Sequence, residues 1–169
     1  LSMREGDQSK IDLLKQSQSL AEVLELAIQF EQAAAKFYRE LIPKVSKSLR
    51  WLVESLADEE DEHAQRLDWM RYHPDLQAAI QHKITTPPTN TRFSDAIHTP
   101  ELQEVVDDQA LLQYALGREQ LAMEQYGFLA AEIEAGKIND LFKWLAAEEL
   151  EHKVELEKLY YEIVHHGGV

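Results

Sequence analysis

A Glu-x-x-His pattern occurs twice in the sequence, once in each half. It pairs Glu60 with His63 and Glu149 with His152. Residues three apart lie on the same face of an α-helix, so each pair can present two metal-ligand side chains together. Roughly one helix upstream of each pair, a single glutamate interrupts an otherwise apolar stretch. These two glutamates are Glu31 and Glu119.

Apolar residues recur in alternating steps of four and three along four segments, as they do on the buried seam of a bundle helix. All six ligand-type residues fall on these seams. Pro43, Pro74 and Gly136 are expected to end helices, and residues 46–48 offer an N-cap. The predicted seams are Leu24, Ile28, Glu31, Ala35, Tyr38, Ile42 and Val45; Leu49, Val53, Leu56, Glu60, His63, Leu67 and Met70; Leu112, Leu116, Glu119, Met123, Tyr126, Ala130 and Ile133; and Ile138, Phe142, Leu145, Glu149, His152, Leu156 and Leu159.

The two halves repeat at a nearly constant distance. Matched residues lie 88 positions apart on the upstream helices and 89 on the downstream helices. We predict an all-α four-helix bundle in which antiparallel hairpins, residues 20–73 and 108–165, are joined by a long crossover, residues 74–107. A single domain, residues 19–165, would follow a polar N-terminal segment, residues 1–18.

Composition narrows the classes of function. The sequence has no cysteine, which excludes disulfides and any iron held by four cysteines within it. A net charge of -14 repels phosphate groups, so we expect neither a nucleic-acid partner nor an anionic membrane surface. No apolar run approaches the ~20 residues of a membrane span. We expect a cytoplasmic protein.

Four glutamates on the inner faces of four helices would bring four negative charges into the core, which is costly unless they are neutralised. None of the four seams carries Lys or Arg. Two divalent cations would neutralise the glutamates, and carboxylate with imidazole suits iron or manganese best. We expect the helix-paired glutamates, Glu60 and Glu149, to be shared between the two ions, and the other four residues to be more terminal ligands.

The motifs resemble those of the rubrerythrin branch of the ferritin-like di-iron carboxylate proteins. The shared patterns are Glu31-x-x-Ala34-x-x-x-Tyr38, Glu119-x-x-Ala122-x-x-x-Tyr126 and the Glu-x-x-His-Ala of residues 60–64. The resemblance implies a ferritin-like bundle with two iron ions, or another divalent pair such as Fe/Mn, that reacts with hydrogen peroxide or dioxygen. It also implies a homodimer.

The sequence departs from the peroxidase rubrerythrins in two ways. It lacks their four-cysteine rubredoxin-like domain, so electrons would come from an external donor. It also has Ala122 where they carry an extra glutamate, which gives the more symmetric four-Glu, two-His set of bacterioferritins. A ferroxidase or iron-handling module is therefore a second hypothesis, and a non-catalytic, metal-stabilised scaffold is a third.

Residues around the six ligands have predicted supporting roles. Tyr38 and Tyr126 are candidate hydrogen-bond donors to the ligands or electron relays, or else simple core tyrosines. We expect one of the neighbouring acidic residues to orient a ligand histidine through its second nitrogen. Glu162 and His165 repeat the Glu-x-x-His spacing without an upstream glutamate, and we expect them to lie on a solvated helix end. The neighbouring acidic candidates are Glu59, Asp61, Glu62, Glu148 and Glu151.

Overall fold

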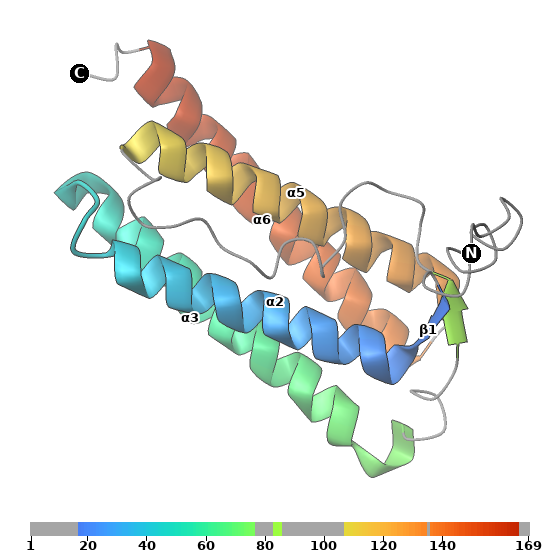
Figure 1. Ribbon diagram of the computed structural model, residues 1–169. Helices are drawn as coiled ribbons and strands as arrows, with labels where there is room; N and C mark the ends of the chain where they lie inside the picture. The colour runs from blue at the N-terminus through green and yellow to red at the C-terminus, as the bar shows by residue number, and fades with distance from the viewer. Residues whose placement is uncertain (1–16, 77–82, 86–106, 135, 166–169) are drawn as a thin grey trace, which may run out of the picture.

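The computed structural model describes residues 17–76, 83–85, 107–134 and 136–165. Its long helices pair as two hairpins that lie against each other in a bundle (Figure 1). The predicted all-α four-helix architecture is confirmed. The helices are α2 (Leu20–Leu41), α3 (Lys47–Tyr72), α5 (Asp108–Glu132) and α6 (Lys137–His165).

Local sequence signals explain where the helices begin and end. The Ser19 side chain accepts a hydrogen bond from the Glu22 amide at 3.2 Å and caps α2. Helix α2 ends two residues before Pro43, and α3 ends before Pro74, which begins the 3-10 helix η1 (Pro74–Leu76). Before Pro74, His73 has an extended backbone, because proline disfavours helical backbone in the residue before it. Before Pro43, Ile42 keeps helical dihedrals, and α2 ends there because proline has no amide to donate to the next helical hydrogen bond.

The start of α3 differs from the prediction. Ser46 precedes the helix, but its side chain makes no capping hydrogen bond. Its hydroxyl instead donates to Asp108 at 2.5 Å, at the start of α5. Ser46 therefore ties the two hairpins together, because a carboxylate from the other hairpin is the stronger acceptor.

A short connection joins α5 to α6. Gly136 has a φ of 155°, a backbone conformation that other residues rarely adopt. The buried Asn139 side chain donates to the carbonyl oxygens of Ala130 and Ile133. These bonds satisfy carbonyls at the end of α5 and hold α6 antiparallel to it.

The apolar core forms two clusters, and each draws side chains from all four helices. One cluster contains Leu24, Leu67, Tyr126 and Phe142, and the other contains Tyr38, Val53, Leu112 and Leu156. The six predicted ligands belong to neither cluster. The polar layer therefore lies between two apolar ones.

The predicted seam of α3 is buried along its whole length. On α5 the prediction is only partly right, because Leu116, Met123 and Ile133 are half-buried. Helix α5 instead buries a broader face than the predicted seam. The buried residues of α5 that its predicted seam omits are Leu111, Ala115, Arg118, Leu121, Ala122, Gln125 and Leu129.

A short antiparallel β-pair was not predicted. Strand β1 (Ser17–Ser19) pairs with β2 (Lys83–Thr85), immediately before α2. Two strands this short pair through main-chain hydrogen bonds, so the pattern of side chains in the sequence gives little signal for them. Most of the N-terminal segment and of the crossover lies outside the described residues, and the domain boundaries stay a prediction.

None of the described helices has the length and apolar character needed to cross a membrane.

Candidate metal centre

The structure brings all six predicted residues together in the middle of the bundle. Two groups form, and in each the ligand atoms lie within 4.8 Å of one another. Glu60 and Glu149 take part in both groups, which is the sharing expected from the sequence. The first group is Glu31, Glu60, His63 and Glu149, and the second is Glu60, Glu119, Glu149 and His152.

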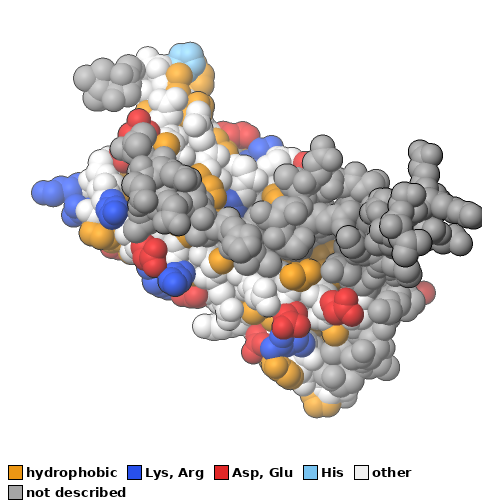
Figure 2. All heavy atoms as spheres, in the orientation of Figure 1, with side chains coloured by type: hydrophobic (Ala, Val, Ile, Leu, Met, Phe, Trp, Pro, Cys, Tyr) orange, Lys and Arg blue, Asp and Glu red, His pale blue; other side chains and the backbone are white. Residues whose placement is uncertain are grey.

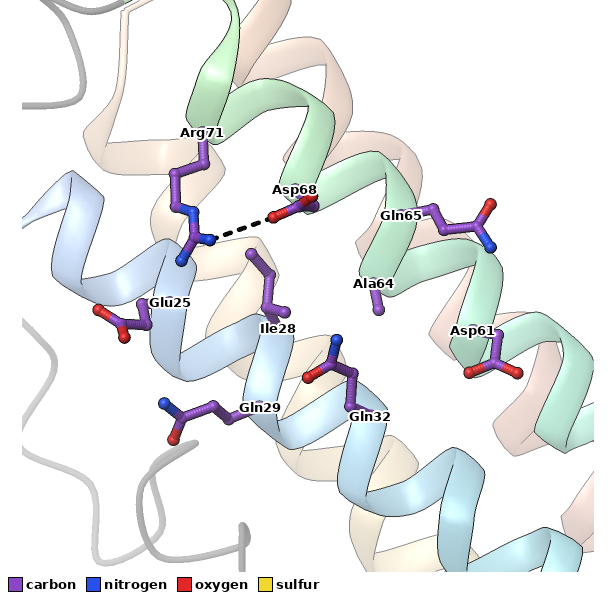
Figure 3. A pocket seen from close by; sticks show the side chains of 9 residues that line it. All are labelled: Glu25, Ile28, Gln29, Gln32, Asp61, Ala64, Gln65, Asp68 and Arg71. Atoms are coloured by element: carbon purple, nitrogen blue, oxygen red, sulfur yellow. Dashed lines mark hydrogen bonds and ion pairs between the residues drawn. The ribbon is translucent and has the colours of Figure 1, made fainter.

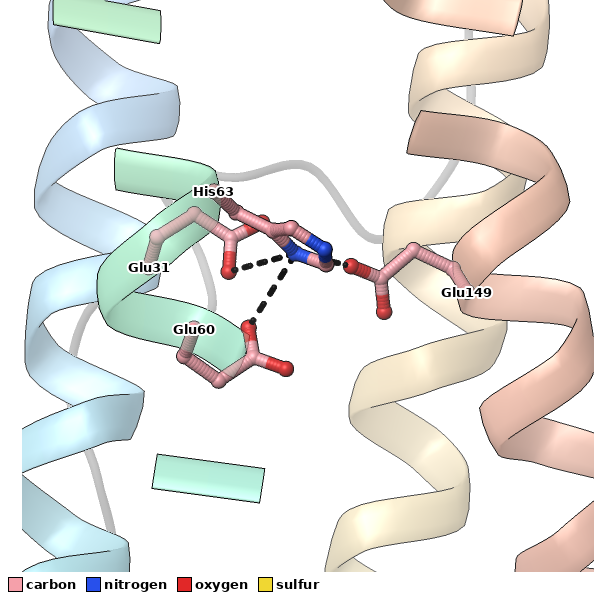
Figure 4. Close-up of side chains that lie close together, drawn as sticks. All are labelled: Glu31, Glu60, His63 and Glu149. Carbon is pink, nitrogen blue, oxygen red and sulfur yellow. Dashed lines mark ion pairs between the residues drawn. The ribbon is translucent and has the colours of Figure 1, made fainter. Parts of the chain in front are cut away.

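In the first group, three carboxylates surround one imidazole nitrogen. The Nδ1 atom of His63 lies 2.9 Å from Oε1 of Glu149, 3.7 Å from Oε2 of Glu31 and 3.9 Å from Oε2 of Glu60 (Figure 4). Glu149 reaches this group from α6, across the interface between the hairpins. The site therefore depends on the packing of one hairpin against the other.

The second group is the counterpart of the first. The Nδ1 atom of His152 lies 3.7 Å from Oε2 of Glu119 and 3.9 Å from Oε2 of Glu149. On the far side of the ring, Nε2 lies 2.6 Å from Oε2 of Glu59 on α3. Of the five acidic candidates, Glu59 is therefore the one that contacts His152, through the ring nitrogen that faces away from the other carboxylates. The rings of His63 and His152 are nearly parallel, with centroids 6.0 Å apart.

The donor atoms fit a pair of divalent cations. All four glutamates are fully buried, and His63 and His152 are 1% and 6% exposed. Several carboxylate oxygens and both Nδ1 atoms have no hydrogen-bond partner within the described residues. Buried polar atoms are almost always satisfied, so convergent acceptors of this kind indicate a cation. Carboxylate with imidazole favours iron or manganese over calcium.

One basic side chain enters the site, and the expectation that no Lys or Arg neutralises the glutamates is wrong. Arg118 is 5% exposed, and its Nη2 donates to Oε2 of Glu31 at 3.1 Å and lies 2.8 Å from Oε2 of Glu60. Its Nη1 lies 3.5 Å from Oε1 of Glu119. Arg118 directly precedes the predicted seam residue Glu119, so the alternating steps of four and three residues did not identify it as buried.

The shared environment changes the acidity of the ligands. Burial raises the pKa of Glu60 well above its usual range, although the charge of Arg118 opposes the rise. Burial also favours the neutral form of Glu31, but Glu60, Arg118 and His63 together hold its pKa below the usual range. Burial opposes the charged form of His152, yet Glu119 and Glu59 raise its pKa to about 10.

The two repeated tyrosines differ. Tyr126 donates to Oε1 of Glu31 at 2.6 Å, and both groups are buried. Tyr38 is equally buried, but its hydroxyl has no hydrogen-bond partner within the described residues. Tyr126 therefore donates to one of the predicted ligands, whereas Tyr38 packs as a core residue.

Aromatic packing covers the first group on one side. The Trp144 ring meets His63 edge-on, with centroids 5.7 Å apart, and the guanidinium of Arg66 lies 4.3 Å from the Trp144 centroid. The predicted solvated pair is confirmed, because Glu162 and His165 are exposed near the end of α6.

The described surface has a groove of about 400 Å³ on the outer face of the first hairpin (Figure 3). It contains none of the six residues, so it is distinct from the metal centre. Acidic and basic side chains are interspersed on the face in Figure 2, without a broad basic patch among its coloured residues. The groove is lined by Glu25, Ile28, Gln29, Gln32, Asp61, Ala64, Gln65, Asp68 and Arg71.

Comparisons with known proteins agree with this geometry. The rubrerythrin family model matches residues 22–101. The chain is rubrerythrin-like, with a ferritin-like fold. No curated protein gives a significant match.

Two solved structures share the fold of this rubrerythrin-like chain. A candidate ferritin-like diiron-carboxylate protein from Thermotoga maritima is 20% identical, with a TM-score of 0.66 over 86% of this chain and 96% of that one. A hypothetical protein from Pyrococcus furiosus is 25% identical, with a TM-score of 0.66 over 87% and 91% of the two chains.

Proposed function

We propose that the protein is a non-haem di-iron oxidoreductase that reduces hydrogen peroxide or dioxygen. The observation that carries the proposal is the pair of buried ligand groups that share Glu60 and Glu149. A shared carboxylate places two ions within a few ångströms of each other, at the roughly 3.5–4 Å typical of two-metal sites. Two bound iron ions would supply the electrons for reducing the oxidant.

The side chains of this chain prepare the site for that chemistry. Glu59 holds the imidazole of His152 so that Nδ1 faces the carboxylates, and Tyr126 fixes one oxygen of Glu31. The apolar clusters on either side exclude bulk water, which strengthens electrostatic interactions inside. The side chains are thus positioned before a metal ion binds.

Electrons must come from a separate donor. Reduction of hydrogen peroxide to two waters takes two electrons and two protons, and each turnover leaves the iron oxidised. The sequence has no cysteine to hold an electron-transfer iron, so we propose an external electron-donor protein.

A ferroxidase is the second candidate. Its support is the symmetry of the site, in which each histidine faces three carboxylates and the buried Ala122 stands where peroxidase rubrerythrins carry a further glutamate. In this function Fe(II) is the substrate and is released after oxidation.

Anaerobic titration with Fe(II), followed by addition of peroxide or dioxygen with and without a chemical reductant, tests both candidates. Glu60→Ala should abolish iron binding and oxidant consumption. Glu62→Ala is the matched control, since Glu62 is exposed and pairs with Arg66. Repeated peroxide reduction in the presence of reductant supports the oxidoreductase, and continued oxidation of added Fe(II) beyond about two ions per chain supports the ferroxidase. Iron binding without oxidant consumption would overturn both and favour a metal-stabilised scaffold.

A further inference from the structure

Arg118 is a fixed positive charge at the centre of a site whose geometry otherwise suits cations. It lies on α5 directly before Glu119 and contacts carboxylates from three helices. A guanidinium keeps its charge at any accessible pH. A metal ion that binds these carboxylates must therefore do so beside a permanent cation.

The site has a His63 half, the first group, and a His152 half, the second group. The closer contacts of Arg118 are to the carboxylate oxygens that face His63. In the His63 half, the oxygens that face Nδ1 are Oε1 of Glu149, Oε2 of Glu31 and Oε2 of Glu60. Arg118 Nη2 contacts the two Oε2 atoms, at 3.1 and 2.8 Å. The guanidinium thus contacts two of the three carboxylate oxygens that face Nδ1 of His63.

The His152 half is left more open. There the oxygens that face Nδ1 are Oε2 of Glu119 and Oε2 of Glu149. Arg118 approaches only the other oxygen of Glu119, at 3.5 Å. An ion held by His152 can therefore bind Glu119 and Glu149 through these oxygens without displacing the guanidinium, which in this half contacts the shared Glu60 most closely.

A single position of the internal repeat creates this difference. The residue 88 positions before Arg118 is Phe30, and the guanidinium carbon lies 4.1 Å from the centre of the Phe30 ring. The equivalent positions thus meet in the bundle, one apolar and one charged. The aromatic face also stabilises the buried cation.

We infer that Arg118 is the internal counter-ion of the metal-free site and makes the two metal positions unequal, so that the His152 half binds metal first. The His63 half binds metal only when Arg118 releases Glu31 and Glu60. Breaking a charge-assisted contact and placing a second cation nearby both weaken binding in this half. This role of Arg118 rests on the proposed two-metal site, but not on its redox activity.

Anaerobic titration with Co(II) alone tests the inference, because the ion reports its coordination optically and needs no turnover. The native protein should bind two Co(II) in separate phases whose dissociation constants differ by roughly tenfold or more, the size expected for one charge-assisted hydrogen bond. His63→Gln should abolish only the weaker phase. Arg118→Met should tighten the weaker phase by roughly tenfold and lower the melting temperature of the metal-free protein.

Arg39→Met is the matched control, since Arg39 pairs with Asp58 and Asp61 on the surface. It should leave both phases unchanged. Two equal phases in the native protein, or loss of the stronger phase in His63→Gln, would overturn the inference, and neither result needs Arg118→Met to fold. An unchanged or looser weak phase in a folded Arg118→Met protein would also overturn it. No Co(II) bound by the native protein would instead refute the metal site and the proposed function with it.

Discussion

His152 and Glu59 connect the two hairpins through a contact that leaves the ligand nitrogen of His152 free. Nε2 lies 2.6 Å from Oε2 of Glu59, while Nδ1 faces Glu119 and Glu149. A carboxylate at the second nitrogen fixes the orientation of a ligand histidine and raises its basicity. Through this contact, a residue of α3 orients a predicted ligand of α6.

Glu59→Ala should therefore weaken metal binding by the His152 half, by about 10- to 100-fold in dissociation constant. Isothermal titration with Co(II) measures the change. Glu148→Ala is the control, because Glu148 occupies the equivalent position 89 residues later and is also half-buried. Equal losses in the two variants would show that general charge, and not the contact with His152, controls affinity.

The two repeated tyrosines should respond differently to loss of their hydroxyl groups. Tyr126→Phe leaves Oε1 of Glu31 buried without its donor and should lower the unfolding free energy of the metal-free protein by about 1–3 kcal/mol. Tyr38→Phe removes a hydroxyl that has no partner within the described residues, so it should be neutral or stabilising. Urea unfolding of both variants compares them directly. A larger loss in Tyr38→Phe would contradict the assignment of these roles.

The metal-free protein should lose stability as the pH rises from neutral. Burial lowers the pKa of His152, but Glu119 and Glu59 outweigh it and raise the pKa from 6.5 to about 10. Their stabilising effect is complete below the unfolded-state pKa and is lost as pH rises through the folded-state value. Burial raises the pKa of Glu60 as well, so its titration acts in the same direction.

Melting temperatures of the metal-free protein between about pH 7 and 10 test this expectation. Glu59→Gln should reduce the slope, since it removes one of the carboxylates that raise the pKa of His152. A melting temperature that rises across this range would contradict the charge assignment of His152.

Much of this site could be predicted from the sequence because each predicted ligand lies on a helix that the spacing of its apolar residues reveals. The spacing of Glu60 and His63, and its repetition at Glu149 and His152, determines which faces they share. Side-chain contacts between different helices are harder to predict from the sequence. The sequence left five acidic candidates for a contact with a ligand histidine, and Glu59 makes it. The choice depends on how α3 is rotated relative to α6, and residue spacing within one helix does not determine that rotation.

Arg118 was missed for a related reason. The four-three seam of α5 passed from Leu116 to Glu119, but the helix buries a broader face that includes Ala115 and Arg118. A long flexible side chain can also reach inward from beside a seam. The signal available in the sequence was the repeat itself, because Arg118 stands 88 positions after a residue, Phe30, that is apolar.

The shared and terminal ligands should be separable by counting bound ions. Glu60 and Glu149 belong to both groups, whereas Glu31 belongs only to the first and Glu119 only to the second. Replacing a shared carboxylate removes a ligand from both positions, so Glu60→Ala or Glu149→Ala should bind almost no metal.

The terminal replacements should each spare one half of the site. Glu31→Ala should retain about one ion per chain at the His152 half, and Glu119→Ala about one at the His63 half, because each leaves all four carboxylate and imidazole ligands of the other group intact. Elemental analysis after Co(II) loading and desalting gives the count, with Glu62→Ala as the control that should retain two. If Glu31→Ala lost both ions while Glu60→Ala kept one, the assignment of Glu60 as the shared ligand would be wrong. Intact helical circular dichroism in every variant separates loss of a ligand from loss of the bundle, since Glu149 also crosses the interface between the hairpins.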